Sequence, residues 1–74
     1  MSVEGIIREL EIVANAERTV LIKVRLDLFS AQRYGRSTID PLIRIAVAED
    51  RLVAAECTLA MWRQDLQDLS EAGR

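Results

Sequence analysis

Three arginines and the only tyrosine, near the middle of the chain, have side chains that could bind an anion. They are Arg33, Tyr34, Arg36 and Arg44, in and beside the polar segment RYGRSTIDP of residues 33–41. A guanidinium group donates paired hydrogen bonds to a phosphate or a carboxylate. These residues are therefore candidates for contact with an anion or with acidic groups of a partner. The alternative is a solvated loop that places positive charge at a helix end.

Side chains suited to catalysis or metal binding are otherwise scarce. The chain has no histidine, the commonest general base and metal ligand, and only one cysteine, Cys57. A single cysteine without histidine is a weak candidate for a nucleophile. No glycine-rich phosphate loop, zinc-ligand spacing or hydrolase motif occurs. We therefore expect no enzyme activity, no catalytic residues, no cofactor and no metal, and interpret Cys57 as a small buried apolar residue.

The length and composition of the chain suit one small domain, residues 1–74. Half of the residues are apolar, more than a monomer of this size can bury, so a partner surface is expected. The net charge of −2 gives no general attraction to nucleic acid. Because the chain has one cysteine, no leader-like N-terminus and no apolar stretch of membrane-spanning length, we expect a soluble cytoplasmic protein.

Apolar residues recur at alternating spacings of three and four in both halves of the chain, the heptad pattern of a coiled coil. In the first half these seam positions are Ile7, Leu10, Ala14, Glu17, Leu21, Val24, Leu28 and Ala31. In the second half they are Ile45, Ala48, Leu52, Ala55, Leu59, Trp62, Leu66 and Leu69. The pattern predicts an all-α fold, an antiparallel helical hairpin with helices at about 3–32 and 40–72.

The segment between the two seams contains residues that end one helix and begin another. Gly35 suits the end of the first helix, because glycine readily adopts a left-handed backbone. Asp40 and Pro41 suit the first turn of the second helix. Its cap is predicted to be Ser37, Thr38 or Asp40. We therefore interpret this segment as the loop of the hairpin.

Folding the chain back about residue 38 matches the two seams layer by layer. Small residues then face large ones at most layers, as a tight helix pair requires. Ala14 falls opposite Trp62, which we interpret as a core residue. Glu17 falls opposite Leu59, and it is either buried or paired with Arg63.

Further apolar residues at helical spacing lie outside the seams and define a second face on each helix. They are Ile22, Leu26, Phe29, Ile43, Val47, Ala54, Cys57 and Met61. Because a hairpin seam covers neither face, we expect these eight residues to form an interface. The expected assembly is a homodimeric four-helix bundle, or a hairpin docked on a larger protein.

Charge is segregated along the chain in a way that favours one orientation of a dimer. Residues 18–51 hold seven basic and four acidic residues. Residues 1–17 hold one basic and four acidic residues, and residues 52–74 hold two basic and four acidic ones. A hairpin places the acidic segments together at its open end and the basic segment towards its loop. An antiparallel homodimer pairs opposite charges, and we expect that orientation.

One stretch of the first half is compatible with a strand in place of a helix. TVLIKVRL, residues 19–26, is rich in β-branched residues and alternates in part. The turn and the apolar positions that follow it are Gly35, Arg36, Ser37, Leu42, Ile43 and Ala46. On these features residues 19–48 resemble a ribbon-helix-helix repressor. The resemblance implies a DNA-binding regulator as an alternative, whereas the heptad pattern predicts helix.

A second resemblance starts at the same loop and runs to residue 65. The residues that carry it are Arg33, Tyr34, Gly35, Ser37, Asp40, Leu42, Ala48, Glu49, Leu52 and Ala55. Residues 33–65 are similar in this pattern to the helical repeat of TolC-type outer-membrane efflux proteins. The resemblance implies a long helix after an aspartate-containing turn, and it does not imply export or transport.

These patterns together predict the class of function. We expect a small non-catalytic interaction, assembly or accessory protein that acts through its apolar second face. The first alternative is the ribbon-helix-helix-like DNA-binding regulator. The second alternative is a small helical subunit of a larger enzyme or secretion complex.

Overall fold

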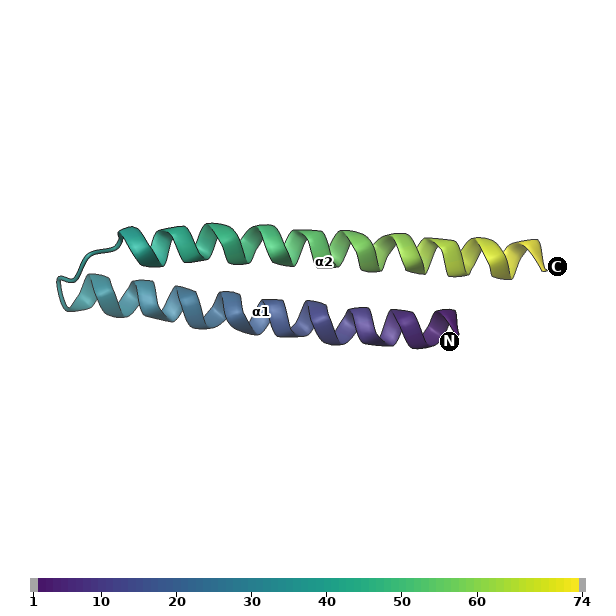
Figure 1. The fold of residues 1–74 in the computed structure, drawn as a ribbon, viewed down its shortest axis with the longest axis horizontal. Coiled ribbons are helices and arrows are strands. Elements are labelled where there is room, and N and C mark those ends of the chain that lie inside the picture. Colours follow the sequence, from purple (N-terminus) through teal and green to yellow (C-terminus); the bar gives the residue numbers. More distant parts are fainter. Residues whose placement is uncertain (1, 74) are drawn as a thin grey trace.

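Two long antiparallel α-helices make up the part of the chain that the computed structural model describes, residues 2–73 (Figure 1). Helix α1 spans Val3–Arg33 and helix α2 spans Ile39–Ala72. The Cα atoms of the rod extend over 61 × 15 × 15 Å. The predicted all-α hairpin is confirmed, and the observed helix bounds lie within one residue of the predicted ones.

Residues 19–26, where a strand was the alternative, lie in the middle of α1. The strand interpretation is therefore wrong, and residues 2–73 contain no strand. Leu21 and Val24 in this stretch are buried against α2. Packing of the apolar stripe outweighs the β-propensity of the branched residues, because tertiary contacts supply most of the stability of a helix in a protein.

A Schellman turn ends α1 and begins the connection to α2. The amide of Gly35 donates a hydrogen bond to the carbonyl of Gln32 at 3.4 Å, and that of Arg36 donates to the carbonyl of Ala31 at 2.8 Å. Gly35 has a φ of 67°, in the left-handed region that a residue without Cβ adopts easily. The prediction that Gly35 ends the first helix is confirmed.

The two helix starts differ in how their free amides are satisfied. At α1, the Oγ of Ser2 accepts a hydrogen bond from the amide of Gly5 at 3.1 Å. At α2, Thr38 occupies the cap position, but its side chain makes no capping hydrogen bond. Asp40 and Pro41 lie in the first turn as predicted, where a carboxylate suits the positive end of the helix dipole and proline needs no N–H.

The core of the hairpin is the seam between α1 and α2. The buried residues are Ile7, Ala14, Leu21, Val24, Ala31, Ala48 and Leu59. All of these are predicted seam positions. Trp62 is half-buried and packs against the cluster of Ala14 and Leu59, so its predicted place in the core is confirmed. Leu69 is the seam residue that remains exposed, and α2 extends beyond the start of α1 at this end (Figure 1).

The alignment of the two helices differs from the predicted one, which placed the start of α1 level with the end of α2, whereas α2 extends beyond the start of α1 (Figure 1). Two ion pairs fix it, Glu11–Arg63 and Arg18–Glu56. Ala14 and Leu59 line the hollow beside these pairs, and Trp62 packs against the cluster that contains both of them. The physical reason is the Schellman turn at Gly35, which reverses the chain before the predicted centre at residue 38.

The same shift changes the surroundings of Glu17. Arg63, its predicted partner, pairs with Glu11 at 2.9 Å. Glu17 is half-buried and lines a groove together with Arg51 and Ala55. Of the two alternatives for Glu17, the pairing with Arg63 is therefore wrong, and its burial is partial.

Candidate functional site

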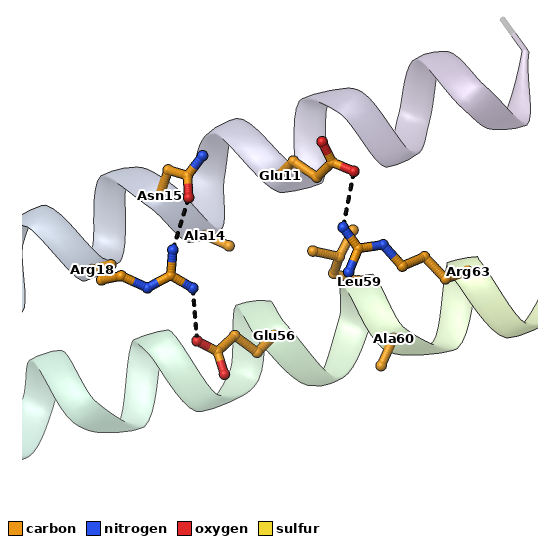
Figure 2. Close-up of a pocket in the computed structure, with 8 residues that line it drawn as sticks. All are labelled: Glu11, Ala14, Asn15, Arg18, Glu56, Leu59, Ala60 and Arg63. Atoms are coloured by element: carbon orange, nitrogen blue, oxygen red, sulfur yellow. Dashed lines mark hydrogen bonds and ion pairs between the residues drawn. The ribbon is translucent and has the colours of Figure 1, made fainter.

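One flank of the hairpin carries a ladder of ion pairs between the two helices. The pairs are Glu11–Arg63 at 2.9 Å, Arg18–Glu56 at 3.2 Å and Arg25–Glu49 at 3.8 Å. From one ion pair to the next, the α1 residue lies seven positions later in the chain and the α2 residue seven positions earlier. Antiparallel helices with heptad repeats require this spacing. Figure 2 shows the first two pairs beside the seam. We call this side the ion-pair flank.

The ion-pair flank aligns the helices more than it stabilises them. Its charged side chains are about half exposed, and exposed ion pairs contribute only about 0.2–1 kcal/mol each. Arg18 also donates a hydrogen bond of 2.8 Å to the Oδ1 of Asn15, which holds its guanidinium over the seam (Figure 2). Because its charges are matched within one hairpin, this flank is suited to contact with water.

The opposite flank is lined by apolar side chains from both helices. We call it the apolar flank and define it by its residues Val13, Val20, Ile43, Val47 and Ala54. Two shallow grooves run along it, and Arg51 lines both of them. Val13, Val20 and Val47 leave 48%, 44% and 45% of their surface exposed. The hairpin therefore presents a half-covered apolar strip on this side, with Glu17, Arg44, Arg51 and Thr58 also lining its grooves.

Heptad positions explain why the two flanks differ. With the seam at positions a and d, the ion pairs join e positions of both helices. Val13 and Val20 occupy g positions of α1, on the other side of the seam. Val47 and Ala54 occupy c positions of α2, which lie beside the g positions of the same helix. Antiparallel packing brings e beside e and g beside g, so the ion pairs lie on one side of the seam. Val13 and Val20 lie on the other side, beside the polar g residues of α2, Arg44, Arg51 and Thr58.

Three of the predicted interface residues lie on a different surface from the others. Ile22, Leu26 and Phe29 are exposed and occupy b and f positions of α1, which face away from α2 and border the ion-pair flank. We call these three residues the outer patch. The eight residues expected to form an interface thus belong to separate surfaces. The expectation took each helix by itself and did not include how the two helices lie side by side.

The two remaining predicted interface residues lie on the exposed side of α2. Met61 is 68% exposed and follows Ala54 by one heptad, so it continues the c positions of the apolar flank towards the open end. Cys57 is exposed in the hairpin. The expectation that Cys57 is buried is therefore wrong, because its f position is the one farthest from the seam.

Sequence reasoning missed two residues of the apolar flank and the whole ion-pair ladder. Val13 and Val20 are exposed at g positions of α1, and Ile6 precedes them at the same spacing. Apolar residues repeated every seven positions beside a seam are the signal that could have identified them. Charges of opposite sign at matching heptad steps of the two halves could likewise have predicted the ladder.

The loop end brings together some of the residues proposed to contact an anion. Arg36 donates a hydrogen bond of 2.8 Å to the Oγ of Ser30, and its guanidinium carbon lies 5.7 Å from the centre of the Tyr34 ring. Arg36 and Arg44 line one hollow, which also contains two carboxylates. These carboxylates belong to Asp27 and Asp40.

This arrangement gives Arg36 a role within the hairpin. Its guanidinium ties the loop back to α1, and carboxylates already lie near it and near Arg44. Arg33 lies in the last turn of α1, where positive charge is favourable beside the free carbonyl groups. The geometry thus fits the loop interpretation of this segment better than a dedicated anion site.

The described part of the chain shows neither a group of metal ligands nor a membrane-spanning helix. Among residues 2–73, histidine, cysteine, aspartate and glutamate form no group of three or more that could hold a metal ion. Neither helix, over the residues described, combines the length and apolar character needed to cross a membrane. No protein-family model, no curated protein and no solved structure matches this chain.

Proposed function

We propose that this protein is a small non-catalytic helical interaction protein, which acts by docking its apolar flank on another protein surface. The observation that carries the proposal is the strip of half-exposed side chains that α1 and α2 build together, from Val13 and Val20 to Val47. Contiguous exposed apolar surface on a small protein marks an interaction site. The lone cysteine, which allows no internal disulfide, supports a cytoplasmic location as part of this proposal.

The surface area of the hairpin supports the proposal. Its solvent-accessible surface is 5730 Å². A compact monomer of 8.4 kDa exposes about 4600 Å², by the usual relation between surface and mass. The excess of about 1100 Å² comes from the elongated two-helix shape. A partner that covers one side of the rod would remove an area of this size from water.

The balance of buried and exposed apolar residues supports it as well. Among residues 2–73, fourteen large hydrophobic residues are exposed and seven hydrophobic residues are buried. Three of those seven are alanines, whose burial contributes little. A hairpin with so small a core gains stability if association buries further apolar surface.

The partner in this proposal is a protein. Two kinds of partner meet the requirement for an apolar surface of matching length. One is a second copy of the chain, and the other is a larger enzyme or secretion complex. A DNA-binding role receives less support, because Arg18, Arg25 and Arg63 each lie within an ion pair. Contacts to DNA phosphates need basic side chains that are available on one face.

Co-purification with defined stoichiometry tests the proposed function. A tagged chain is expressed in its native cell together with an untagged copy, and the captured material is quantified by native mass spectrometry. The control is a tagged chain with Val13→Lys and Val47→Lys. We expect the parent chain to carry a stoichiometric protein partner, of either kind, that the control has lost. A chain recovered only as an 8.4 kDa monomer would contradict the proposal.

A further inference from the structure

We propose that the apolar flank is covered by a second copy of this chain, in antiparallel orientation, with a two-fold axis beside Ala54. The product is a four-helix bundle in which the two ion-pair flanks face outwards. The inference rests on one point of the proposed function, namely that the apolar flank is a docking surface. It adds which protein docks there, in which orientation and through which residues.

The apolar residues of α2 are arranged symmetrically about Ala54. Val47 precedes Ala54 by seven positions and Met61 follows it by seven, so all three share one helix face. An antiparallel copy related by a two-fold axis at Ala54 places Val47 at the level of Met61 of the second copy. Val20 of α1 lies near the level of Ala54, since the pair Arg18–Glu56 fixes the alignment there. An isologous interface needs this self-complementarity.

The charges on the apolar flank are complementary in the same arrangement. Arg44 lies ten positions before Ala54 and Asp65 eleven positions after it, both at g positions of α2. The two-fold axis therefore places Arg44 beside Asp65 of the second copy, and the pair occurs twice in the dimer. A parallel dimer would instead place Arg44 beside Arg44. Like charges in register disfavour that orientation.

The area available fits a dimer of ordinary size. Each partner in a stable protein interface buries about 800 Å². The hairpin exposes about 1100 Å² more than a compact monomer of its mass, by the relation between surface and mass. Covering one flank along the rod removes most of that excess.

The other surfaces are less suited to a second copy. The ion-pair flank has its charges matched within one hairpin, so a partner there would have to desolvate them. The outer patch of Ile22, Leu26 and Phe29 belongs to α1 alone and has no contribution from α2. The apolar flank is an apolar surface to which both helices contribute.

A matched pair of variants tests which surface associates. Val47→Glu changes the apolar flank and Phe29→Glu makes the same kind of change on the outer patch, and both residues are exposed, so the hairpin should fold in each case. Circular dichroism confirms the helix content before sedimentation equilibrium is run. We expect Val47→Glu to weaken dimerisation by about 100-fold or more, because it buries two unpaired carboxylates. Phe29→Glu should leave it unchanged. The reverse result, or a monomeric parent chain, overturns the inference.

A monomeric parent chain that still carries another protein in stoichiometric amount would overturn this inference and leave the proposed function standing. A monomeric parent chain without any partner would overturn both. The two results are distinguished by the native mass spectrometry described above.

A charge exchange and two labels test the orientation. Arg44→Glu and Asp65→Arg should each weaken dimerisation by about 2- to 30-fold, and the double variant should restore it. A spin label on the native Cys57, three residues from the axis, should lie within about 25 Å of its twin. A label on Ser37→Cys, with Cys57→Ser, should lie more than about 35 Å from its twin. No restoration in the double variant, a short Ser37 distance or a long Cys57 distance overturns the proposed arrangement.

Discussion

Arg63 of α2 donates a hydrogen bond of 2.9 Å to Glu11 of α1, which lies 52 positions away in the chain. The two side chains meet only when the hairpin has the alignment described above. A slide of α2 by one seam layer would move them apart by about 5 Å, since each residue advances a helix by about 1.5 Å. This ion pair therefore reports directly on the register of the two helices.

A double-mutant cycle on this pair measures the register in solution. Glu11→Gln and Arg63→Gln should show a coupling of about 0.2–1 kcal/mol in the free energy of unfolding, the range for exposed ion pairs. The coupling should fall in 1 M salt because the charges are screened. The measurement is urea denaturation of the parent, the single variants and the double variant.

The matched control for this cycle replaces Glu11→Gln by Glu17→Gln. Glu17 does not take part in the ladder, so its coupling to Arg63 should be close to zero. A larger coupling for Glu17 than for Glu11 would restore the alignment predicted from the sequence.

Burial along α1 predicts opposite effects for two leucines five residues apart. Leu21 is 5% exposed in the seam, and Leu21→Asp should unfold the hairpin, because a buried, unpaired carboxylate costs about 3 kcal/mol or more. Leu26 is 62% exposed in the outer patch, and Leu26→Asp should change the stability by less than about 0.5 kcal/mol. Helix content by circular dichroism and the melting temperature distinguish them. Equal effects of the two substitutions would show that the seam is misplaced.

The left-handed backbone at Gly35 predicts a cost for any side chain there. Gly35→Ala should destabilise the hairpin by about 1–2 kcal/mol, the cost of a left-handed conformation for a residue with Cβ. No atom lies within 4 Å of the added Cβ, so the loss would come from backbone strain and not from a clash. The control is Gly73→Ala at the end of α2, where φ is −78° and the change should be neutral or slightly stabilising. Thermal unfolding of both variants shows whether the loss of stability in Gly35→Ala comes from backbone strain or from a general effect of replacing glycine by alanine.

The short connection between the helices predicts where a protease cuts first. Residues 34–38 are the non-helical segment between α1 and α2. Trypsin at low concentration should cleave after Arg33 or Arg36 before any site within the helices, because a protease needs locally unfolded chain. Mass spectrometry of the first fragments identifies the site. An early cut after Arg18 or Lys23 would show that α1 opens in its middle, contrary to the hairpin.

The sequence by itself determined the secondary structure and the core. Alternating spacings of three and four placed an apolar stripe on each helix, and Gly35 with Pro41 separated the two helices. Every buried residue among 2–73 lies on these stripes. The periodicity is a local property, because helical geometry alone decides which residues share a face. β-propensity indicated a different structure only at residues 19–26. There, burial of Leu21 and Val24 outweighs the preference of branched residues for strands.

The tertiary structure decided how the faces of the two helices combine. Seam residues of similar character permit several alignments, and the Schellman turn at Gly35 together with the ion pairs selects one. Only that alignment shows that Val13 and Val20 belong with Val47, and that Phe29 lies on another side. These relationships depend on which positions of one helix lie beside which positions of the other, and no pattern within a single helix contains that information.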